Sequence, residues 1–160
     1  EMWMFNPKIN RVIKLPPSMM SQAWHGSDFS NNDLAKSDSL KLDYKHSIVG
    51  QEEHEGKKVY LIKSVPKPGA PVVWGMQRLK IRKDGLMLHE TFFDEEMQAV
   101  KKLSLSQIRD FDGKLYPKVW KMEKADSPQE YTLVEYQNLE FEKSLPSQYF
   151  TLSNLRHPRR

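Results

Sequence analysis

Hydrophobic and polar residues alternate with a period of two along much of the chain, which is the pattern of β-strands with one buried face. The alternation is regular at residues 40–44 and again at residues 76–82, where apolar residues alternate with mostly charged ones. Asp84-Gly85 closely follows the second stretch, and both residue types tolerate the positive φ that a tight hairpin requires. On similar patterns we predict further strands at residues 2–6, 11–15, 58–65, 86–93, 97–106, 116–124 and 130–141.

Short turns connect most of these strands. Residues 50–56 form a polar stretch bounded by two glycines, and Asp112-Gly113 is a second tight-turn pair. Residues 66–71 are rich in proline, which disfavours a helix there. Because no long helices alternate with the strands, we predict a mainly β fold built as an antiparallel meander, not an α/β fold. Tyr149, Leu152 and Leu155 indicate a helical turn near the C-terminus.

One long connection, residues 18–37, carries more apolar surface than a simple surface loop. Its bulky apolar residues alternate with residues that favour turns; they are Met19, Met20, Trp24, Phe29 and Leu34. Asn31 or Asn32 is a candidate cap for a short helix, and Asp28 and Ser30 are suited to bind nearby backbone amides. We interpret this connection as a lid across the mouth of a curved sheet.

The composition excludes several classes of site. The chain has 160 residues, a net charge of +4 and no cysteine, so disulfides, thiolate zinc sites and cysteine nucleophiles are excluded. Its 17 aromatic residues argue against disorder. No apolar run reaches the roughly 18 residues of a membrane-spanning helix. Lysine and arginine on strands more often serve solubility, so we expect no nucleic-acid partner.

Two small groups of polar residues resemble catalytic or metal sites. His25, Ser27 and Asp28 are close in sequence, but a triad requires convergence in space and no nucleophile-elbow motif is present. The run at residues 52–55 includes His54, yet it lacks the second histidine of a zinc-protease helix, and we predict that it lies at a hairpin tip. We interpret both groups as turns and expect a non-enzymatic protein without a metal or cofactor.

The remaining candidate site is apolar. We predict that Met19, Met20, Trp24 and Phe29 act as a ligand-binding lid. The residues predicted to line the cavity beneath it are Leu42, Tyr44, Leu79, Ile81, Leu88 and Trp120. Two alternatives stay open, namely a structural or interaction domain whose core is simply filled, and an enzyme of unknown type.

The order of these features resembles the outer-membrane lipoprotein-sorting, or LolA-like, family. Trp3-Met4-Phe5-Asn6-Pro7 is similar to the family's Trp-x-aromatic-x-Pro strand, and residues 11–18 follow at the expected place. Residues 26–30, Gly-Ser-Asp-Phe-Ser, followed by Asp33-Leu34, resemble the signature of one branch of the family. Residues 84–85, 116–122 and 150–155 also occur in the family's order, so the similarity covers essentially the whole chain.

The resemblance implies an incomplete antiparallel barrel whose concave face is plugged by short helices. It implies a periplasmic carrier that binds lipid or lipoprotein acyl chains and exchanges them with donor and acceptor partners at membranes. Residues 1–155 would form a single domain, followed by a basic tail at residues 156–160. Family members begin with a helix and leading strands that this chain lacks, so we expect an exposed sheet edge.

Overall fold

The computed structural model describes residues 2–35, 38–141 and 144–158. Its main feature is an open seven-stranded antiparallel sheet in which each strand pairs with the next one along the chain, and β3 and β9 form the edges. The strands are β3 (Tyr44–His54), β4 (Lys57–Pro66), β5 (Met76–Arg82), β6 (Met87–Phe93), β7 (Ala99–Phe111), β8 (Lys114–Lys124) and β9 (Tyr131–Glu135). The predicted mainly β, unclosed antiparallel fold is confirmed.

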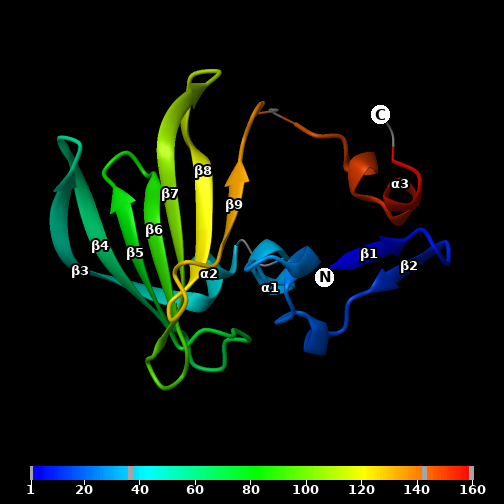
Figure 1. Ribbon diagram of the computed structural model, residues 1–160, viewed down its shortest axis with the longest axis horizontal. Helices are drawn as coiled ribbons and strands as arrows, with labels where there is room; N and C mark the ends of the chain where they lie inside the picture. Colours follow the sequence, from blue (N-terminus) through cyan, green and yellow to red (C-terminus); the bar gives the residue numbers. More distant parts are fainter. Residues whose placement is uncertain (1, 36–37, 142–143, 159–160) are drawn as a thin grey trace.

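The N-terminal strands form a separate hairpin. β1 (Trp3–Asn6) pairs with β2 (Arg11–Lys14), and this two-stranded sheet does not join the larger one. The predicted C-terminal helical turn is present as η3 (Ser147–Phe150) and α3 (Leu152–Arg156), and α3 contacts both strands of the hairpin (Figure 1). The two ends of the chain therefore pack together beside the sheet. Of the predicted basic tail, residues 159–160 lie outside the described residues.

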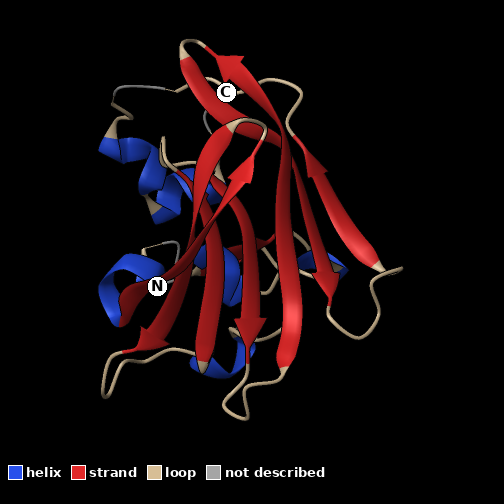
Figure 2. Cartoon of the chain, turned by 90° about the vertical axis from the view of Figure 1, so that its left-hand side faces the viewer, coloured by secondary structure: helices blue, strands red, loops and turns tan. Residues whose placement is uncertain are grey.

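The short helices lie on one side of the sheet. Besides η3 and α3, they are η1 (Pro17–Met19), η2 (Trp24–Gly26), α1 (Asn31–Ala35) and α2 (Ser39–Asp43). In Figure 2 the helical segments lie behind the long, twisted strands. None of the described helices is long and apolar enough to cross a membrane.

The prediction of a strand at residues 40–44 is wrong, because residues 39–43 form α2 and β3 begins only at Tyr44. The neighbouring strand gives the reason. Tyr44 pairs with Pro66, the last residue of β4, after which the chain leaves the sheet in a proline-rich loop. Residues 40–43 therefore have no strand to pair with. Lys41 and Leu42 donate to the carbonyl of Asp38, and the carbonyl of Asp43 accepts from the amide of Lys67.

Three further boundaries differ from the prediction, and one of them is the end of β7, which continues to Phe111 and not to residue 106. Most of the polar stretch at residues 50–56 belongs to β3, which continues to His54 past a bulge between Ile48 and Gly50. The turn itself is at Glu55-Gly56, where φ is 50° and 69°. At the other edge, β9 ends at Glu135 and not at residue 141. The turns at Asp84-Gly85 and Asp112-Gly113 lie between strands as predicted.

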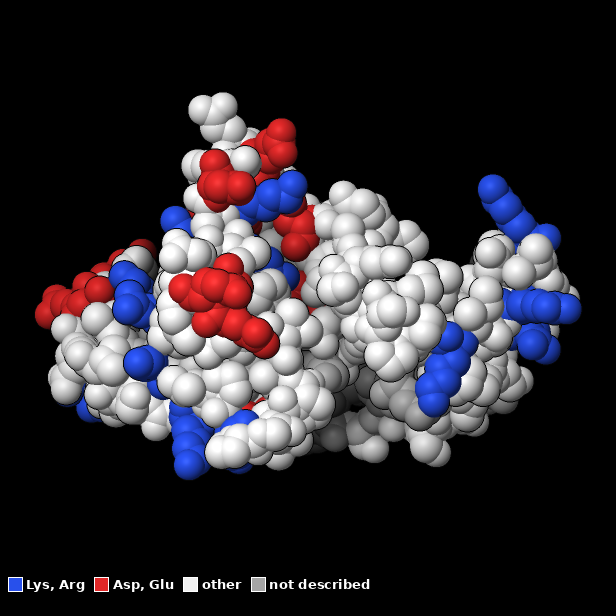
Figure 3. Space-filling view, turned by 90° about the horizontal axis from the view of Figure 1, so that it is seen from below, with Lys and Arg blue, Asp and Glu red and all other residues white. Residues whose placement is uncertain are grey.

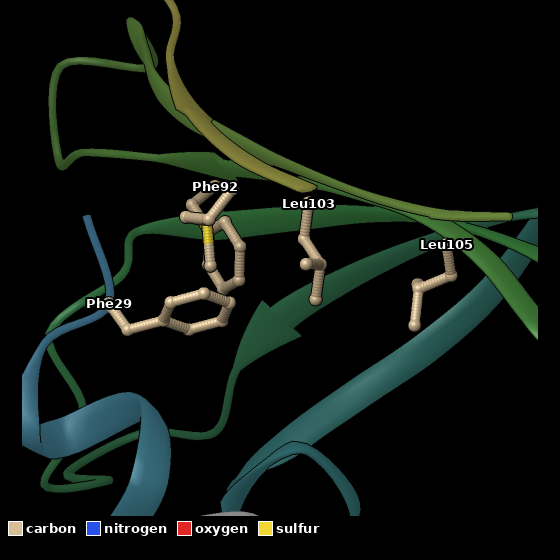
Figure 4. Packing of buried hydrophobic residues seen from close by; sticks show 5 residues of the cluster. Phe29, Phe92, Leu103 and Leu105 are labelled. Atoms are coloured by element: carbon tan, nitrogen blue, oxygen red, sulfur yellow. The ribbon is translucent and has the colours of Figure 1, made fainter. Parts of the chain in front are cut away.

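The core lies on the concave face of the sheet, against the connection that we interpreted as a lid. Its buried cluster is Phe29, Phe92, Leu103, Leu105 and Met122, and Trp74, Met87, Trp120 and Val134 pack against it. Cross-strand pairing sets Leu103 opposite Met122 and Leu105 opposite Trp120, so these side chains share one face. Figure 4 shows Phe29 reaching from its loop towards Phe92 on the sheet.

Candidate functional site

The site is centred on the loop that carries Phe29. Ser27 stabilises its tip, because its hydroxyl donates to the carbonyl of Trp24 at 2.6 Å and accepts from the amide of Phe29 at 3.2 Å. The preceding residues, His25 and Gly26, both have positive φ, at 49° and 74°. A backbone bond of 2.7 Å from Trp24 N to Phe29 O closes the turn. The tip is thus a compact structure whose shape sets the direction of the Phe29 side chain.

Asp28 attaches this loop to the far edge of the sheet. Its amide donates to the hydroxyl of Thr132 in β9 at 2.9 Å, and that hydroxyl donates in turn to Asp28 Oδ2 at 2.7 Å. The sequence placed Asp28 in local turn chemistry, but its carboxylate binds a residue 104 positions away. The loop is therefore held to the strand by a reciprocal pair of hydrogen bonds.

A second attachment involves the start of α1. Ser30 and Asp33 bind each other reciprocally, since each amide donates to the other's side chain, as in a capping box. Ser30, not Asn31 or Asn32, therefore caps the helix. Asp33 Oδ2 also accepts from Lys101 Nζ of β7, and both side chains of this ion pair are about nine-tenths buried. Ser27, Asp28, Ser30 and Asp33, all within the resemblance signature, thus shape this loop or hold it to the sheet.

Phe29, which is 5% exposed, lies between two hollows. The inner cavity has a volume of about 210 Å³ between the loop, α1, α2 and the concave face of the sheet. The outer groove, of about 610 Å³, runs along the other side of the loop towards β7 and the β8–β9 turn. Phe29, Asn32, Val73 and Trp74 line both hollows. The Phe29 loop is therefore part of the wall between the outer groove and the inner cavity.

Lys101 lies at this wall. Besides its ion pair with Asp33, its Nζ lies 4.9 Å from the ring centre of Trp74 and 5.0 Å from that of Phe92. Those two rings are in contact, with centres 5.2 Å apart. A buried ammonium over two aromatic faces is stabilised by the negative potential of the rings as well as by the carboxylate. Lys101 therefore joins the loop, the connection that carries Trp74, and two strands.

A buried carboxyl lines the inner cavity. Glu90 of β6 is 6% exposed. Burial, together with the nearby charge of Asp33, raises its pKa from 4.5 to about 7, against the smaller opposing effect of Lys101. Burial and the charge of Glu90 also raise the pKa of Tyr44 to about 12, while its hydroxyl donates to the carbonyl of Trp74 at 3.2 Å. Near neutral pH the cavity therefore contains a carboxyl poised between its protonated and ionised forms.

The predicted site residues have different positions. Among the predicted lid residues, Phe29 lines the two hollows. Met19 and Met20 are partly buried, and Trp24 is 38% exposed and packs edge-on against His25. Among the lining residues, Tyr44 and Trp120 line the inner cavity. The structure does not bring Leu42 there, because it lies in α2 with 67% of its surface exposed.

The other three lining candidates lie on β5 and β6. Leu79 is buried opposite Glu90, and Ile81 lies opposite Met87. Leu88 is the extra residue of a β-bulge, since the register passes from the pair Lys80–His89 directly to Ile81–Met87. The bulge places Met87, not Leu88, on the wall of the inner cavity, and Leu88 lines a different hollow near His89.

Sequence reasoning missed the polar half of the site, which consists of Asp33, Gln77, Glu90 and Lys101, as well as the aromatic Trp74. A signal was present for three of them. Gln77 keeps the period-two phase of Leu79, and Lys101 keeps that of Leu103 and Leu105. Glu90 is in phase with Phe92 in the same way. A polar residue in the phase of an apolar face indicates a buried polar group.

Of the two polar groups first considered for chemistry, His25, Ser27 and Asp28 belong to the Phe29 loop, whereas the run at residues 52–55 is separate from this site. Glu52 forms an ion pair of 2.9 Å with Lys80 near the end of β3, and His54 is at the exposed hairpin tip. In the described part of the chain no group of three or more His, Asp or Glu residues is arranged to hold a metal ion. On the face seen in Figure 3, Lys and Arg lie in separate small groups and not in one continuous basic patch.

We expect Glu90→Gln to change how stability depends on pH. The Glu90 carboxyl titrates near its ordinary 4.5 when unfolded and near 7 when folded. Between these values only the unfolded chain loses the proton, so the wild type loses stability as pH rises, by up to about 3 kcal/mol in total. Glutamine cannot ionise. The variant's free energy of unfolding in urea should therefore exceed that of the wild type by an amount that grows from pH 5 to pH 8. Glu96→Gln, at an exposed turn, controls for the loss of one carboxylate. Parallel wild-type and Glu90→Gln curves would contradict this.

The chain shares its open antiparallel sheet, with a loop and short helices on the concave face, with solved structures of a LolA superfamily protein and of an outer membrane lipoprotein-sorting protein domain. A family model described as an uncharacterized protein matches residues 1–157, and the chain belongs to that family. No curated protein matches it.

Solved structures that share the fold include three bacterial proteins. A DUF1329 family protein from Desulfovibrio piger is 27% identical to this chain, and the TM-score is 0.84. The match covers 96% of this chain and 63% of the Desulfovibrio piger chain. An outer membrane lipoprotein-sorting protein domain from Vibrio parahaemolyticus is 19% identical to this chain, with a TM-score of 0.83. The match covers 97% of this chain and 65% of the Vibrio parahaemolyticus chain. A LolA superfamily protein from Nitrosomonas europaea is 19% identical to this chain, with a TM-score of 0.71. The match covers 94% of this chain and 66% of the Nitrosomonas europaea chain. The chain thus spans just under two thirds of the length of each.

Proposed function

We propose that this protein is a carrier that binds lipid or lipoprotein acyl chains between the Phe29 loop and the concave face of the sheet. It would act in lipoprotein sorting or lipid transport in the periplasm, with membrane proteins as donor and acceptor. The observation that carries the proposal is the position of Phe29 in the wall between the outer groove and the inner cavity. The proposal is one of binding, and it assigns no reaction to the chain.

The sizes of the two hollows define how binding would work. A cavity of about 150 Å³ accepts a benzene ring, whereas drug-sized ligands occupy about 300–1,000 Å³. The inner cavity, at about 210 Å³, therefore holds only a short apolar segment with the loop in place. Movement of Phe29 would join it to the outer groove of about 610 Å³. Each methylene buried in the joined space would then contribute about 0.8 kcal/mol.

The attachments of the loop make this movement a discrete step. Asp28 holds the loop to Thr132, and Asp33 holds it to Lys101. Opening has to break these contacts, so a partner that competes for them would promote uptake or release. The small inner cavity also fits the second candidate, a structural or interaction domain with a filled core. The two functions differ in whether the loop has to open.

A reversible lock on the loop tests the proposal. The chain has no cysteine, so Asp28→Cys/Thr132→Cys introduces the only pair, at two residues whose side chains are already in contact. The probe is cis-parinaric acid, a fluorescent fatty acid. We expect the reduced variant to bind this probe. The oxidised variant should bind it more weakly, because the disulfide holds the loop closed and lowers the fraction of molecules whose loop is open.

The same protein with and without reductant is its own control. Wild type treated with oxidant and reductant controls for effects of the reagents, because it has no thiol. Equal binding by the locked and reduced forms would mean that the acyl chain does not enter past the loop. Absence of binding by the wild type and by both forms would leave the filled-core domain as the function.

A further inference from the structure

Glu90 places a buried carboxyl without a partner on the wall of the inner cavity. It is 6% exposed, and within the described part of the chain no group donates a hydrogen bond to its carboxyl or forms an ion pair with it. In that part of the chain the side-chain atoms that are both unpartnered and completely enclosed are Gln77 Oε1 and Trp120 Nε1, so the Glu90 oxygens keep access to the cavity. A buried carboxylate in this state destabilises the protein unless a ligand supplies the missing partner.

The charged groups around Glu90 leave its negative charge uncompensated. They are Asp33 of α1 and Lys101 of β7, and the ammonium of Lys101 is already paired with the carboxylate of Asp33. Tyr44, whose phenol also interacts with Glu90, has a pKa of about 12 and is neutral at physiological pH. The ionised form of Glu90 therefore lacks a cation of its own, and a positively charged ligand would supply it.

The rest of the cavity wall suits an organic cation. Besides Glu90 it contains the aromatic side chains of Phe29, Tyr44, Trp74, Phe92 and Trp120. The negative faces of aromatic rings attract alkylammonium groups, and this attraction is strongest where water is excluded. The protein already holds one ammonium in this way, because Lys101 Nζ contacts the carboxylate of Asp33 and lies over the rings of Trp74 and Phe92. Glu90 and the remaining rings offer the same combination of groups to a ligand.

We propose that the inner cavity is a binding site for a small organic ammonium ion, whose charge pairs with Glu90 and whose alkyl groups contact the aromatic wall. A cavity of about 150 Å³ accepts a benzene ring, and choline has about as many heavy atoms. The inner cavity, at about 210 Å³, therefore has room for such a cation with the Phe29 loop in place. The inference goes beyond the proposed function, because it concerns a cation and requires neither an acyl chain nor movement of the loop.

Two probes of the same shape test the proposal. In 3,3-dimethyl-1-butanol a neutral carbon takes the place of the charged nitrogen of choline. The neutral alcohol gains neither the ion pair with Glu90 nor the attraction of a cation to the rings. We therefore expect the wild type at pH 8 to bind choline about tenfold more tightly than the alcohol, or better, as measured by ligand-observed NMR titration.

The affinity for choline should also depend on pH. The pKa of Glu90 is about 7, because burial and the charge of Asp33 raise it against the smaller effect of Lys101. The carboxyl is therefore about nine-tenths protonated at pH 6 and about nine-tenths ionised at pH 8. Because the ionised form is the one that pairs with a cation, the affinity for choline should rise about tenfold between these two values. The affinity for the neutral alcohol should not rise.

A variant that removes the charge should remove the preference. Glu90→Gln keeps the size of the side chain, and it should bind choline no more tightly than the alcohol at pH 6 and at pH 8 alike. Since this variant is expected to be more stable than the wild type at pH 8, weaker binding there would not reflect unfolding. Glu96→Gln, at an exposed turn, is the matched control and should keep both the preference and its pH dependence.

Each outcome separates this inference from the proposed function. Equal or tighter binding of the alcohol by the wild type would overturn the cation site, and so would a choline preference that survives in Glu90→Gln or an affinity that does not rise with pH. Binding of cis-parinaric acid without binding of choline would also overturn it, while the carrier would stand. Binding of choline without cis-parinaric acid would support the cation site and contradict the carrier. If neither molecule binds, both proposals fail.

Discussion

Replacing Lys101 with methionine is expected to destabilise the protein by about 3–5 kcal/mol, because it leaves a buried carboxylate without its cation. The ion pair with Asp33 is about nine-tenths buried, and the ammonium also contacts the rings of Trp74 and Phe92. Methionine keeps most of the volume of the side chain, so the loss reports the charge and not a cavity. Urea unfolding at pH 7 measures the change.

Replacing Asp33 as well shows whether the loss of stability comes from the unpaired charge. Lys101→Met/Asp33→Asn should recover most of the loss, since replacing both members of a buried pair is often close to neutral. Asparagine at position 33 still offers an oxygen to the amide of Ser30. The control is Lys121→Met, which removes a Lys–Glu pair and a lysine–tyrosine contact at a partly exposed site and should cost at most about 1 kcal/mol. Similar losses for Lys101 and Lys121 would contradict the assignment.

Most strands of the sheet were predictable because the signals that specify a hairpin lie close together in the sequence. Alternation at β5, followed by Asp84-Gly85, specifies a hairpin without reference to the rest of the chain. The error at residues 40–44 has the opposite origin. Their alternation is as regular as that of β5, but β4 ends at Pro66 and supplies no partner strand. Whether an alternating segment becomes a strand is therefore decided partly by its neighbour, which a sequence pattern does not contain.

The sequence identified the connection at residues 18–37 as one that packs against the sheet, but not which of its residues does so. Of its described residues, Phe29 is the one in the buried apolar cluster, and Trp24 is partly exposed. Two contacts hold the loop in the position that buries Phe29. They join Asp28 to Thr132 and Asp33 to Lys101. Both join residues more than sixty positions apart, so no local pattern reveals them. Leu88 was misplaced for a related reason, because one bulge residue changes the face on which a side chain lies.

Replacing Phe29 with alanine is expected to cost about 3–5 kcal/mol of stability, the usual range for removing a buried phenylalanine. Phe29 is 5% exposed and packs against a cluster drawn from β6, β7 and β8. Phe150→Ala is the matched control, because that ring is 73% exposed and its loss should change stability by less than about 0.5 kcal/mol. Thermal and urea unfolding of both variants measure the difference, and equal losses would contradict a core role for Phe29.

The same variant connects stability to binding. Removing the ring should join the inner cavity to the outer groove, because Phe29 lines both. A ligand that fills the new space binds only the folded state, so it should raise the unfolding midpoint of Phe29→Ala in proportion to the logarithm of its concentration. p-Xylene is the probe, and it should raise the midpoint of Phe29→Ala more than that of the wild type. If it does not, the loop has collapsed onto the sheet, and the ring fills a core that no ligand replaces.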